Sequence, residues 1–504
     1  MESETTPLHQ RSTSLQYNLH IWRREEARQR DLRRGGAFFL ALCVISLIII
    51  NLAEHLDDGK SKTADPQVEI RAATQPDPAN TTALDNQVYC GLTIQDSGCI
   101  KLPNNGDDHF TYWYFESRNQ PSTDPLVLWL TGGFECSSMV AMLTENGPCH
   151  VLPDLTTKLN PYSWTNKSNV VWLTAVGIIH GDKHDTDNNE DKVGENIYYF
   201  LQEFFQKHPE LANRDFYITG ESYGGHYVPV AAHYVWQKNK QIAGTTFINL
   251  KGIAIGNGLV QAAIQMPHYI DMAIKNAYNI SLVDKAQLDE MKAVMPNCKN
   301  LLEQCSHKKT ACGTVEDYCI QKLFDPMLKA KRNPYDIRLP CKTHGVDTEF
   351  YDMSYVSEYI NAPNVREFLG LDSKLVGEWQ QSNLNIHDAL LKSASPAKPF
   401  DSYVADLLNA GVRVLIYAGD ADLVCNWHGI EAWTLALQWK GKDGFNAAQE
   451  TSFITTNGTT AGLLRSFANQ LTFLRIFSSG HFMLKDQPAV ALDMLNKFLA
   501  SDNF

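Results

Sequence analysis

Short runs of apolar residues recur along most of the chain, with segments of helical apolar spacing between them. Short apolar runs that are rich in aromatic and β-branched residues are typical of buried strands. The predicted strands are Thr111–Phe115, Leu126–Leu130, Val170–Leu173, Phe216–Ile218, Val412–Ala418 and Leu471–Phe477. Glu195–Phe205 is predicted to be a helix. Because strands that alternate with helices form a mainly parallel sheet covered on both faces, we predict an α/β fold for residues 87–504.

A segment in the middle of this region, about residues 270–348, breaks the alternation. Four cysteines follow one another there at intervals of seven residues: Cys298, Cys305, Cys312 and Cys319. Residues seven apart on one helix are separated by roughly 10 Å along its axis, so a hairpin has to bring any disulfide partners together. Zinc is the alternative, but structural zinc sites use closely paired cysteines. We predict a disulfide-stapled, mostly helical insertion that caps the carboxyl edge of the sheet.

The N-terminal part has a different pattern. No residue from Gly35 to Ala53 is charged, and Ala37–Ile50 is close to the minimum length for a membrane-spanning helix. Arginines precede this segment and acidic residues follow it, so the positive-inside rule places residues 1–34 in the cytoplasm. We predict a type II signal anchor at 35–53, a flexible stalk at 54–86 and a lumenal or extracellular domain. The alternative is a cleaved signal peptide and a secreted protein.

Charge and cysteine content narrow the possible partners. The 504 residues carry a formal charge of −13, with arginines clustered only near the N-terminus, which argues against nucleic acid. Eleven cysteines and four Asn-x-Ser/Thr sequons suggest the oxidising compartments of the secretory and endolysosomal or vacuolar system. The candidate glycosylation sites are Asn80, Asn166, Asn279 and Asn457.

No nucleotide-binding fingerprint is present in the chain, so no cofactor is predicted. The acidic stretch Asp182–Lys192 lacks the glycine and the spaced ligands of a calcium loop. We therefore predict no metal site, and expect this stretch to be a solvated surface loop.

The candidate chemistry lies just after the predicted strand Phe216–Ile218, where the chain reads Gly220-Glu-Ser-Tyr-Gly224. The pattern G-x-S-x-G turns a strand sharply into a helix and leaves the serine hydroxyl on a strained elbow. A hydroxyl is a weak nucleophile until a base takes its proton, and the base needs a carboxylate to orient it. Asp422 and His481 each follow a later predicted strand, in the chain order of an α/β-hydrolase, so we predict a triad with Ser222.

Longer landmarks make a family resemblance specific. In chain order they are Trp129–Ser138, Glu145–Pro148, Gly220–Gly225, Gly256–Gly258, Tyr417–Trp427 and Gly480–His481. On these residues the chain resembles the serine carboxypeptidases over essentially everything after the stalk. The resemblance implies an α/β-hydrolase fold and a serine-type exopeptidase that removes C-terminal residues from peptides or proteins. It also implies an oxyanion hole formed by the backbone amides of Gly133 and Tyr223.

The resemblance further implies a site for the terminal carboxylate of the substrate. It assigns six residues to this site and the surrounding pocket: Thr131, Gly132, Glu145, Glu221, Cys425 and Phe482. A glutamate donates a hydrogen bond to a carboxylate only when it is protonated. We therefore expect either a preference for mildly acidic conditions or strongly raised pKa values of Glu145 and Glu221.

Departures from the family pattern leave alternatives open. Thr131 stands where the family has asparagine, and Phe134-Glu135 replaces a Pro-Gly pair in the oxyanion loop. These changes suit an acyltransferase or esterase on the same fold, or a catalytically impaired protein that only binds.

The resemblance also bears on the disulfides. It implies nested Cys298–Cys319 and Cys305–Cys312 bridges, and a local Cys90–Cys99 bridge is a further expectation. Three other cysteines have no predicted partner: Cys136, Cys149 and Cys341.

Overall fold

The computed structural model describes residues 89–91, 93–104, 109–132, 137–174, 189–241, 244–307, 318–344, 347–349, 351, 353–371, 377–380 and 397–502. The chain divides into two units, Met1–Leu84 and Asp85–Phe504, and all described residues belong to the second. The predicted cytoplasmic tail, membrane anchor and most of the stalk are therefore outside the described residues. Within the ranges given above, no helix is long and apolar enough to span a bilayer.

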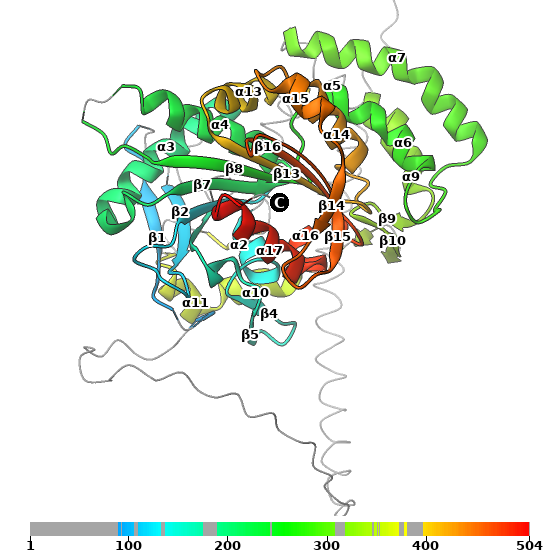
Figure 1. Ribbon diagram of the computed structural model, residues 1–504. Helices are drawn as coiled ribbons and strands as arrows, with labels where there is room; N and C mark the ends of the chain where they lie inside the picture. The colour runs from blue at the N-terminus through cyan, green and yellow to red at the C-terminus, as the bar shows by residue number, and fades with distance from the viewer. Residues whose placement is uncertain are drawn as a thin grey trace, which may run out of the picture. The chain divides into compact units, whose positions relative to one another are not determined.

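Ten strands form one sheet in the order β1-β2-β6-β3-β7-β8-β13-β16-β15-β14 (Figure 1). Their bounds are β1 Gln95–Lys101, β2 His109–Phe115, β3 Leu126–Leu130, β6 Asn169–Thr174, β7 Phe216–Glu221, β8 Leu250–Gly256, β13 Arg413–Gly419, β14 Thr451–Ile454, β15 Thr460–Phe467 and β16 Leu471–Ile476. The six central strands, from β6 to β16, pair in parallel, and the outer strands pair antiparallel at both edges. The predicted α/β class and all six predicted strands are confirmed.

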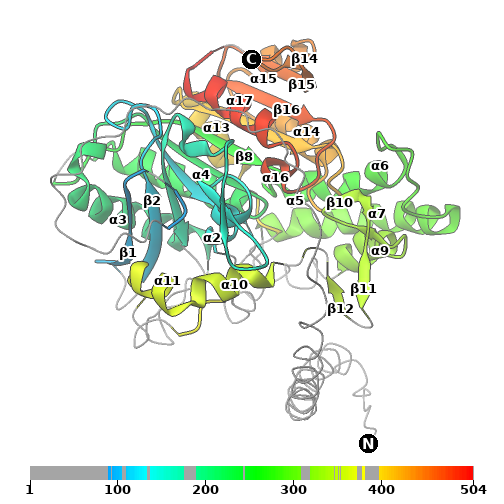
Figure 2. The same cartoon turned by 90° about the horizontal axis from the view of Figure 1, so that it is seen from below.

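Helices cover both faces of this sheet, because its central strands are apolar on both sides and have to be buried on both. One face packs against α3 Glu190–Lys207, α4 Gly224–Lys238, α13 Asp401–Asn409, α14 Trp427–Ala436 and α15 Lys442–Ala447. The other face packs against α2 Met139–Thr144, α10 Ser354–Asn361, α11 Pro363–Phe368, α16 Met483–Asp486 and α17 Pro488–Leu499. Figures 1 and 2 show the two helical layers with the sheet between them.

The predicted cap is a separate, mostly helical region with its own small core, beside the carboxyl end of the sheet (Figure 2). Its elements are α5 Ala262–Gln265, η3 Met266–His268, α6 Tyr269–Ile274, α7 Lys285–His307, η5 Ile320–Phe324, α9 Asp325–Leu328, β9 Arg332–Asn333, β10 Asp336–Pro340, β11 Lys342–His344 and β12 Asp347–Glu349. The predicted Cys298–Cys319 disulfide is present, within the core of the cap. Cys305 is also disulfide-bonded, and its predicted partner, Cys312, is outside the described residues.

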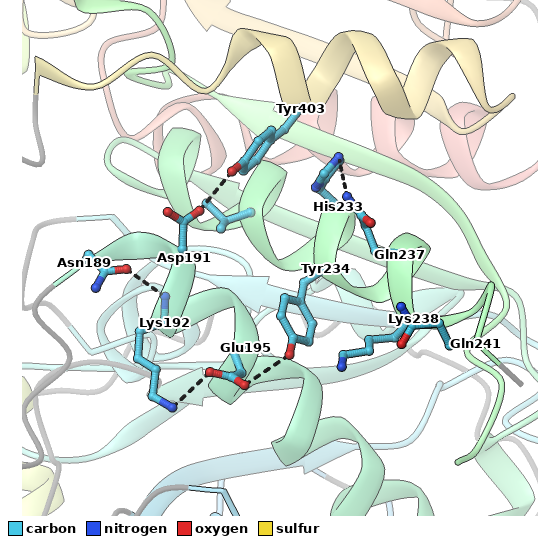
Figure 3. Close-up of a pocket in the computed structure, with 11 residues that line it drawn as sticks. Asn189, Asp191, Lys192, Glu195, His233, Tyr234, Gln237, Lys238, Gln241 and Tyr403 are labelled. Carbon is cyan, nitrogen blue, oxygen red and sulfur yellow. Dashed lines mark hydrogen bonds and ion pairs between the residues drawn. The ribbon is translucent and has the colours of Figure 1, made fainter. Parts of the chain in front are cut away.

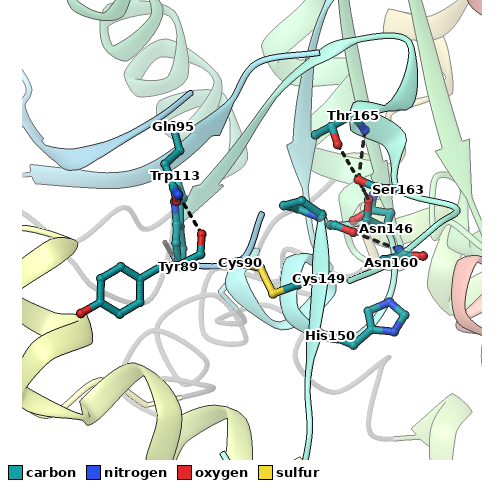
Figure 4. The surroundings of a disulfide bond; sticks show 12 residues. Tyr89, Cys90, Gln95, Trp113, Asn146, Cys149, His150, Asn160, Ser163 and Thr165 are labelled. Carbon is teal, nitrogen blue, oxygen red and sulfur yellow. Dashed lines mark hydrogen bonds between the residues drawn. A yellow bond between two sulfur atoms is a disulfide. The ribbon is translucent and has the colours of Figure 1, made fainter. Parts of the chain in front are cut away.

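The remaining elements are short connections: the hairpin of β4 Cys149–Val151 and β5 Thr157–Leu159, and the turns η1 Trp164–Asn166 and η2 Pro209–Leu211. The β4 strand corrects one prediction. Cys90 is bonded to Cys149 and not to Cys99, which is free (Figure 4). Cys99 lies within β1 and pairs there with Thr111 of β2, so the sheet holds it in place.

A second correction concerns the acidic stretch Asp182–Lys192. Helix α3 begins at Glu190, and Asn189 caps it by accepting a hydrogen bond from Lys192 N. The side chain of Glu190 is fully buried, so this end of the stretch is not a solvated loop. Residues 182–188 are outside the described ranges.

Candidate active site

Ser222 occupies the tight turn between β7 and α4. Its φ of 57° lies in the left-handed region, which is strained for a residue with a side chain. The strain is held by backbone hydrogen bonds: Ser222 N donates to Gly256 O, and Ser222 O accepts from Gly225 N and Leu259 N, each at 3.0 Å. Gly132 lies against this turn, where a Cβ would be 2.3 Å from Ser222 Cβ. The predicted elbow is thus present, and only glycine fits beside it at position 132.

Asp422 and His481 form a buried hydrogen-bonded pair. The two side chains are 0% and 2% exposed, and His481 Nδ1 lies 2.7 Å from Asp422 Oδ2. Asp422 also accepts hydrogen bonds from Asn257 Nδ2 at 2.8 Å, Val424 N at 2.8 Å and Cys425 N at 3.2 Å. These donors hold the carboxyl group in place against Nδ1 of the imidazole, which leaves Nε2 as the base.

The end of β8 links the turn of Ser222 to the Asp422–His481 pair. Gly256 O accepts from Ser222 N, and the next residue, Asn257, donates to Asp422, so β8 holds the elbow and the acid together. Within the described ranges no hydrogen bond joins Ser222 Oγ to His481 Nε2. Such contacts are often long before substrate binds and tighten in the complex. Sequence reasoning gave Asn257 no role, although it stands in the Gly256–Gly258 landmark.

The hairpin of β9 and β10 in the cap is bonded to both loops that carry the acid and the base. Tyr335 O accepts from His481 N at 2.7 Å, and Pro334 O accepts from Leu423 N at 3.0 Å. In the other direction, Ile337 N donates to Ala421 O at 3.0 Å. The cap therefore takes part in positioning the triad.

Phe482, a predicted pocket residue, lies next to the base. Its ring packs against Tyr335 and Tyr351 of the cap region, with centroids 5.5 and 5.2 Å away. The three rings form an aromatic cluster next to the base.

Glu145 and Glu221 form a second buried pair, immediately beside the elbow. They are 1% and 2% exposed, and both carboxyl oxygens of Glu145 and Oε1 of Glu221 have no hydrogen-bond donor among the described residues. Burial raises the pKa of Glu145 to about 7. Burial and the neighbouring Glu145 raise the pKa of Glu221 well above its usual range. Because burial and mutual repulsion disfavour two charges side by side, the two groups keep a proton between them near neutral pH.

Hydrogen bonds and a disulfide hold the turn that carries Glu145, and Figure 4 shows its neighbours Asn146, Cys149 and His150. The Glu145 carbonyl oxygen accepts from Asn160 Nδ2 at 3.1 Å and lies 2.9 Å from His150 Nε2. Four residues on, Cys149 is bonded to Cys90. Glu145 is thus kept in its buried position by the backbone around it, while its side chain has no hydrogen-bond partner in the described part of the chain.

Thr131 and Gly132 follow β3 directly and face the same site. The hydroxyl of Thr131 accepts a hydrogen bond from Trp129 Nε1 at 2.7 Å, and its amide donates to Ser138 Oγ at 3.0 Å. The threonine hydroxyl keeps its own proton for donation. Gly133, the predicted oxyanion donor, and the altered Phe134–Cys136 loop are outside the described residues, so that part of the site stays a prediction.

Comparison with known proteins decides the family. A model of the serine carboxypeptidase family matches residues 92–501. The chain belongs to the serine carboxypeptidase family. It is 37% identical over 408 residues to a carboxypeptidase Y homologue of Sclerotinia sclerotiorum, covering 80% of this chain and 72% of that one. It is 36% identical to a vacuolar serine-type carboxypeptidase of Saccharomyces cerevisiae, covering 78% and 77%.

A solved structure agrees. The structure of a prohormone-processing carboxypeptidase from S. cerevisiae is similar with a TM-score of 0.70 at 25% identity, over 81% of this chain and 91% of that one. The predicted α/β-hydrolase fold and the predicted enzyme class, a serine-type carboxypeptidase, are confirmed.

Cys425 is the one free cysteine of the described residues that lies at the site of this serine carboxypeptidase. Burial, and then the charge of Asp422, raise the pKa of its thiol well above the usual range. Ligand atoms of Cys425, Asp422 and His481 lie within 4.8 Å of one another. His481 Nδ1 and Asp422 Oδ2 already bond each other at 2.7 Å, so the cluster fits a triad better than a metal site.

A further buried carboxyl group, Glu190, supports the other side of the elbow, and sequence reasoning missed it. It accepts a hydrogen bond from Tyr223 Oη at 2.6 Å, pairs with Lys398 Nζ at 3.0 Å, and lies 3.4 Å from His226 Nδ1. Burial alone would raise the pKa of Glu190, but His226, Lys398 and Tyr223 outweigh it and hold the pKa below its usual range. Glu190 is thus a charged carboxylate that anchors Tyr223 and His226, which follow Ser222 in the chain.

A pocket of about 570 Å³ lies between α3, α4 and α13 (Figure 3). Polar side chains line it, among them Glu195, bonded to Tyr234 at 3.2 Å, and Asp191, bonded to Tyr403 at 3.0 Å. None of the predicted site residues lines this pocket, so it is separate from the triad.

Proposed function

We propose that this enzyme removes single residues from the C-termini of peptides through an acyl-enzyme on Ser222. The observation that carries the proposal is the buried Glu145–Glu221 pair beside the elbow. Carboxyl groups that hold a proton near neutral pH can donate a hydrogen bond to a carboxylate, which is what distinguishes a chain end from an internal peptide. Their burial without donors of their own leaves this hydrogen-bonding capacity for a ligand.

The triad supplies the acyl transfer. Ser222 Oγ attacks the last peptide carbonyl while His481 Nε2 takes its proton, and Asp422 stabilises the resulting imidazolium. The oxyanion is held by the backbone amides of Gly133 and Tyr223, the latter anchored through its side chain by Glu190. His481 then gives the proton to the leaving amino group, and water hydrolyses the ester by the same steps in reverse.

Binding of the chain end places the scissile bond. A shared proton on Glu145 or Glu221, together with the hydroxyl of Thr131, offers donors to the two oxygens of a terminal carboxylate. Phe482 and the tyrosines around it offer an apolar wall to the side chain of the substrate. As pH rises above neutrality the shared proton is lost, two negative charges face the substrate carboxylate, and kcat/KM for peptides falls.

The test is a peptide digest with a nucleophile control. We expect the wild type to release free C-terminal amino acids and Ser222→Ala to lose about five orders of magnitude or more in kcat. A fluorophosphonate probe should label the wild type and leave Ser222→Ala unlabelled. Labelling without release of amino acids would contradict the exopeptidase proposal, and absence of labelling would indicate a protein that only binds.

A second candidate is ester or acyl-transfer chemistry on the same triad. The observation in its favour is Thr131, whose short side chain is already bonded to Trp129 and replaces the asparagine found in the family. With fewer fixed donors, the carboxylate site holds a chain end less firmly. Faster turnover of simple acyl esters than of peptides with the same acyl residue would favour this candidate.

We also propose a lumenal or extracellular domain anchored by residues 35–53. Two disulfides in the described part of the chain fit an oxidising compartment, and one relative is named as vacuolar. Asn279 and Asn457 are exposed, as glycosylation requires, whereas Asn166 is half-buried and donates to Pro161 O at 2.7 Å. Asn80 is outside the described residues. Retention of the full chain in membranes after alkaline carbonate extraction tests the anchor, and a soluble, shortened chain would support signal cleavage.

A further inference from the structure

Tyr417 ends in a buried hydroxyl group. Its side chain is 1% exposed, and its Oη has no hydrogen-bond partner in the described part of the chain. A buried hydroxyl without a partner is destabilising, typically by about 1–3 kcal/mol relative to a bonded one. Phenylalanine would fill the same space without this cost, so the hydroxyl calls for a functional explanation.

The sheet register brings Tyr417 to the carboxyl pair. Glu221 on β7 pairs with Gly256 on β8, and Gly256 pairs in turn with Tyr417 on β13. Side chains of paired residues point to the same face of a sheet, so Glu221 and Tyr417 flank a position without a side chain. A Cβ on Gly256 would lie 2.2 Å from the Tyr417 ring and 2.5 Å from its Oη. The ring therefore crosses Gly256 and directs its hydroxyl toward the strand of Glu221.

The Tyr417 hydroxyl is a donor available to the Glu145–Glu221 pair. Burial, and then Glu221 and Glu145, raise the pKa of Tyr417 well above its usual range, so the hydroxyl keeps its proton. The other groups that act on the two glutamates are His481, Asp422, Lys485 and Asp486. Within the described ranges neither these four groups nor Tyr417 is hydrogen-bonded to either glutamate, and among them only the Tyr417 hydroxyl is itself a buried donor without a partner.

We propose that Tyr417 is a positioning residue whose hydroxyl, without a partner among the described residues, turns to donate to Glu221 Oε1 and so fixes the proton shared with Glu145 on the opposite oxygen, ready for the substrate's terminal carboxylate. The inference rests on the proposed function, since it concerns the same carboxyl pair. Tyr417 does not touch the reacting atoms. It acts by holding the proton in the orientation in which it can be donated, and by stabilising the ionised pair once the proton has left.

Tyr417→Phe tests the inference because it removes one oxygen and keeps the ring. We expect KM for a peptide with a free C-terminus to rise several-fold at acidic pH, with kcat little changed. The alkaline limb of kcat/KM should move upward by roughly one pH unit, because the ionised pair has lost a donor that stabilised it. An ester substrate without a free carboxylate should show neither change.

Tyr217→Phe is the matched control. Tyr217 is 2% exposed on the same face of β7, and its hydroxyl donates to Leu499 O at 3.3 Å, remote from the pair. An unmoved alkaline limb in Tyr417→Phe, or an equal shift in Tyr217→Phe or with the ester, would overturn the inference. Fluorophosphonate labelling at the wild-type rate checks that the elbow is intact. If the wild type itself has no alkaline limb specific to the free carboxylate, the proposed function fails and the inference fails with it.

Discussion

Two buried carboxyl sites support the serine elbow from opposite faces of the sheet, and they are built in opposite ways. Glu190, on the face covered by α3 and α4, is surrounded by Tyr223, His226 and Lys398, and its pKa is lowered. Glu145 and Glu221 lie on the face covered by α2. Both oxygens of Glu145 and Oε1 of Glu221 have no donor among the described residues, and the pKa values of both groups are raised. Burial is nearly the same at both sites, so the partners make the difference.

The comparison separates a structural carboxylate from a functional carboxyl group. A buried charge with matched donors is stable at neutral pH and adds rigidity, whereas a buried carboxyl pair without donors is destabilised by ionisation and awaits a ligand. Three variants test this contrast, in decreasing order of expected effect.

Lys398→Met should have the largest effect. It removes the countercharge of Glu190 while keeping the apolar stem, so a buried carboxylate is left short of partners and the free energy of unfolding falls by about 3–5 kcal/mol. Because the pKa of Glu190 is lowered in the folded state, the loss applies above the unfolded value near 4.5 and shrinks as pH falls below it. Chemical denaturation at pH 7 and pH 4 measures both.

Lys192→Met is the control for this change. Lys192 lies on the same helix as Glu190 and pairs with Glu195 at 3.0 Å, but both side chains are 31% exposed. Exposed pairs are worth up to about 1 kcal/mol. Equal effects of the two substitutions would contradict the structural role of Glu190.

Breaking the Cys90–Cys149 disulfide should have the next largest effect. It closes a separation of 59 residues and ties down the turn that carries Glu145, so Cys90→Ser with Cys149→Ser should lower stability by about 2–4 kcal/mol. Thermal unfolding measures this loss, with Cys341→Ser, a free cysteine, as the control. A double variant as stable as the wild type would mean that the hydrogen bonds of the turn suffice to hold Glu145.

Glu145→Gln should have the smallest effect and the opposite sign. With the pKa of Glu145 raised from 4.5 to about 7, the folded state binds more protons than the unfolded state between these values, so wild-type stability falls as pH rises through this window. The variant avoids that loss and should be more stable than the wild type by roughly 1–3 kcal/mol at pH 8, with little difference below pH 4.5.

Glu450→Gln, at an exposed position, is the control for Glu145→Gln and should change stability by less than about 0.5 kcal/mol at either pH. A Glu145→Gln variant that is destabilised at pH 8 would show that the carboxyl pair is structural, as Glu190 is.

The sequence predicted the strands and the serine elbow because both depend on local patterns. Leu126–Leu130 and its counterparts are apolar runs of strand length, and the elbow glycines are required by the turn itself. The Cys298–Cys319 bridge was implied by family resemblance and needs only the fold-back after α7.

The rest depends on register and on contacts between distant segments, which a single sequence does not reveal. Cys149 meets Cys90 only because the turn after α2 comes back to the start of the domain, so the shorter Cys90–Cys99 spacing was misleading. Glu190 looked like one more acid in a polar stretch, and its burial depends on Lys398, 208 residues away. The approach of Tyr417 to Glu221 follows from their common pairing with Gly256.

The hydrogen bonds that Tyr335 O and Pro334 O accept from the loops of His481 and Asp422 have an implication for engineering. A cap that only covered its site could be exchanged between relatives to alter substrate choice. Here the β9–β10 hairpin of the cap also supports the loops that carry Asp422 and His481. In chimeras, only the segment from α6 to α9 should therefore be exchanged and the β9–β10 hairpin kept. Substrate recognition can then be redesigned while the acid and the base keep their hydrogen bonds to the hairpin.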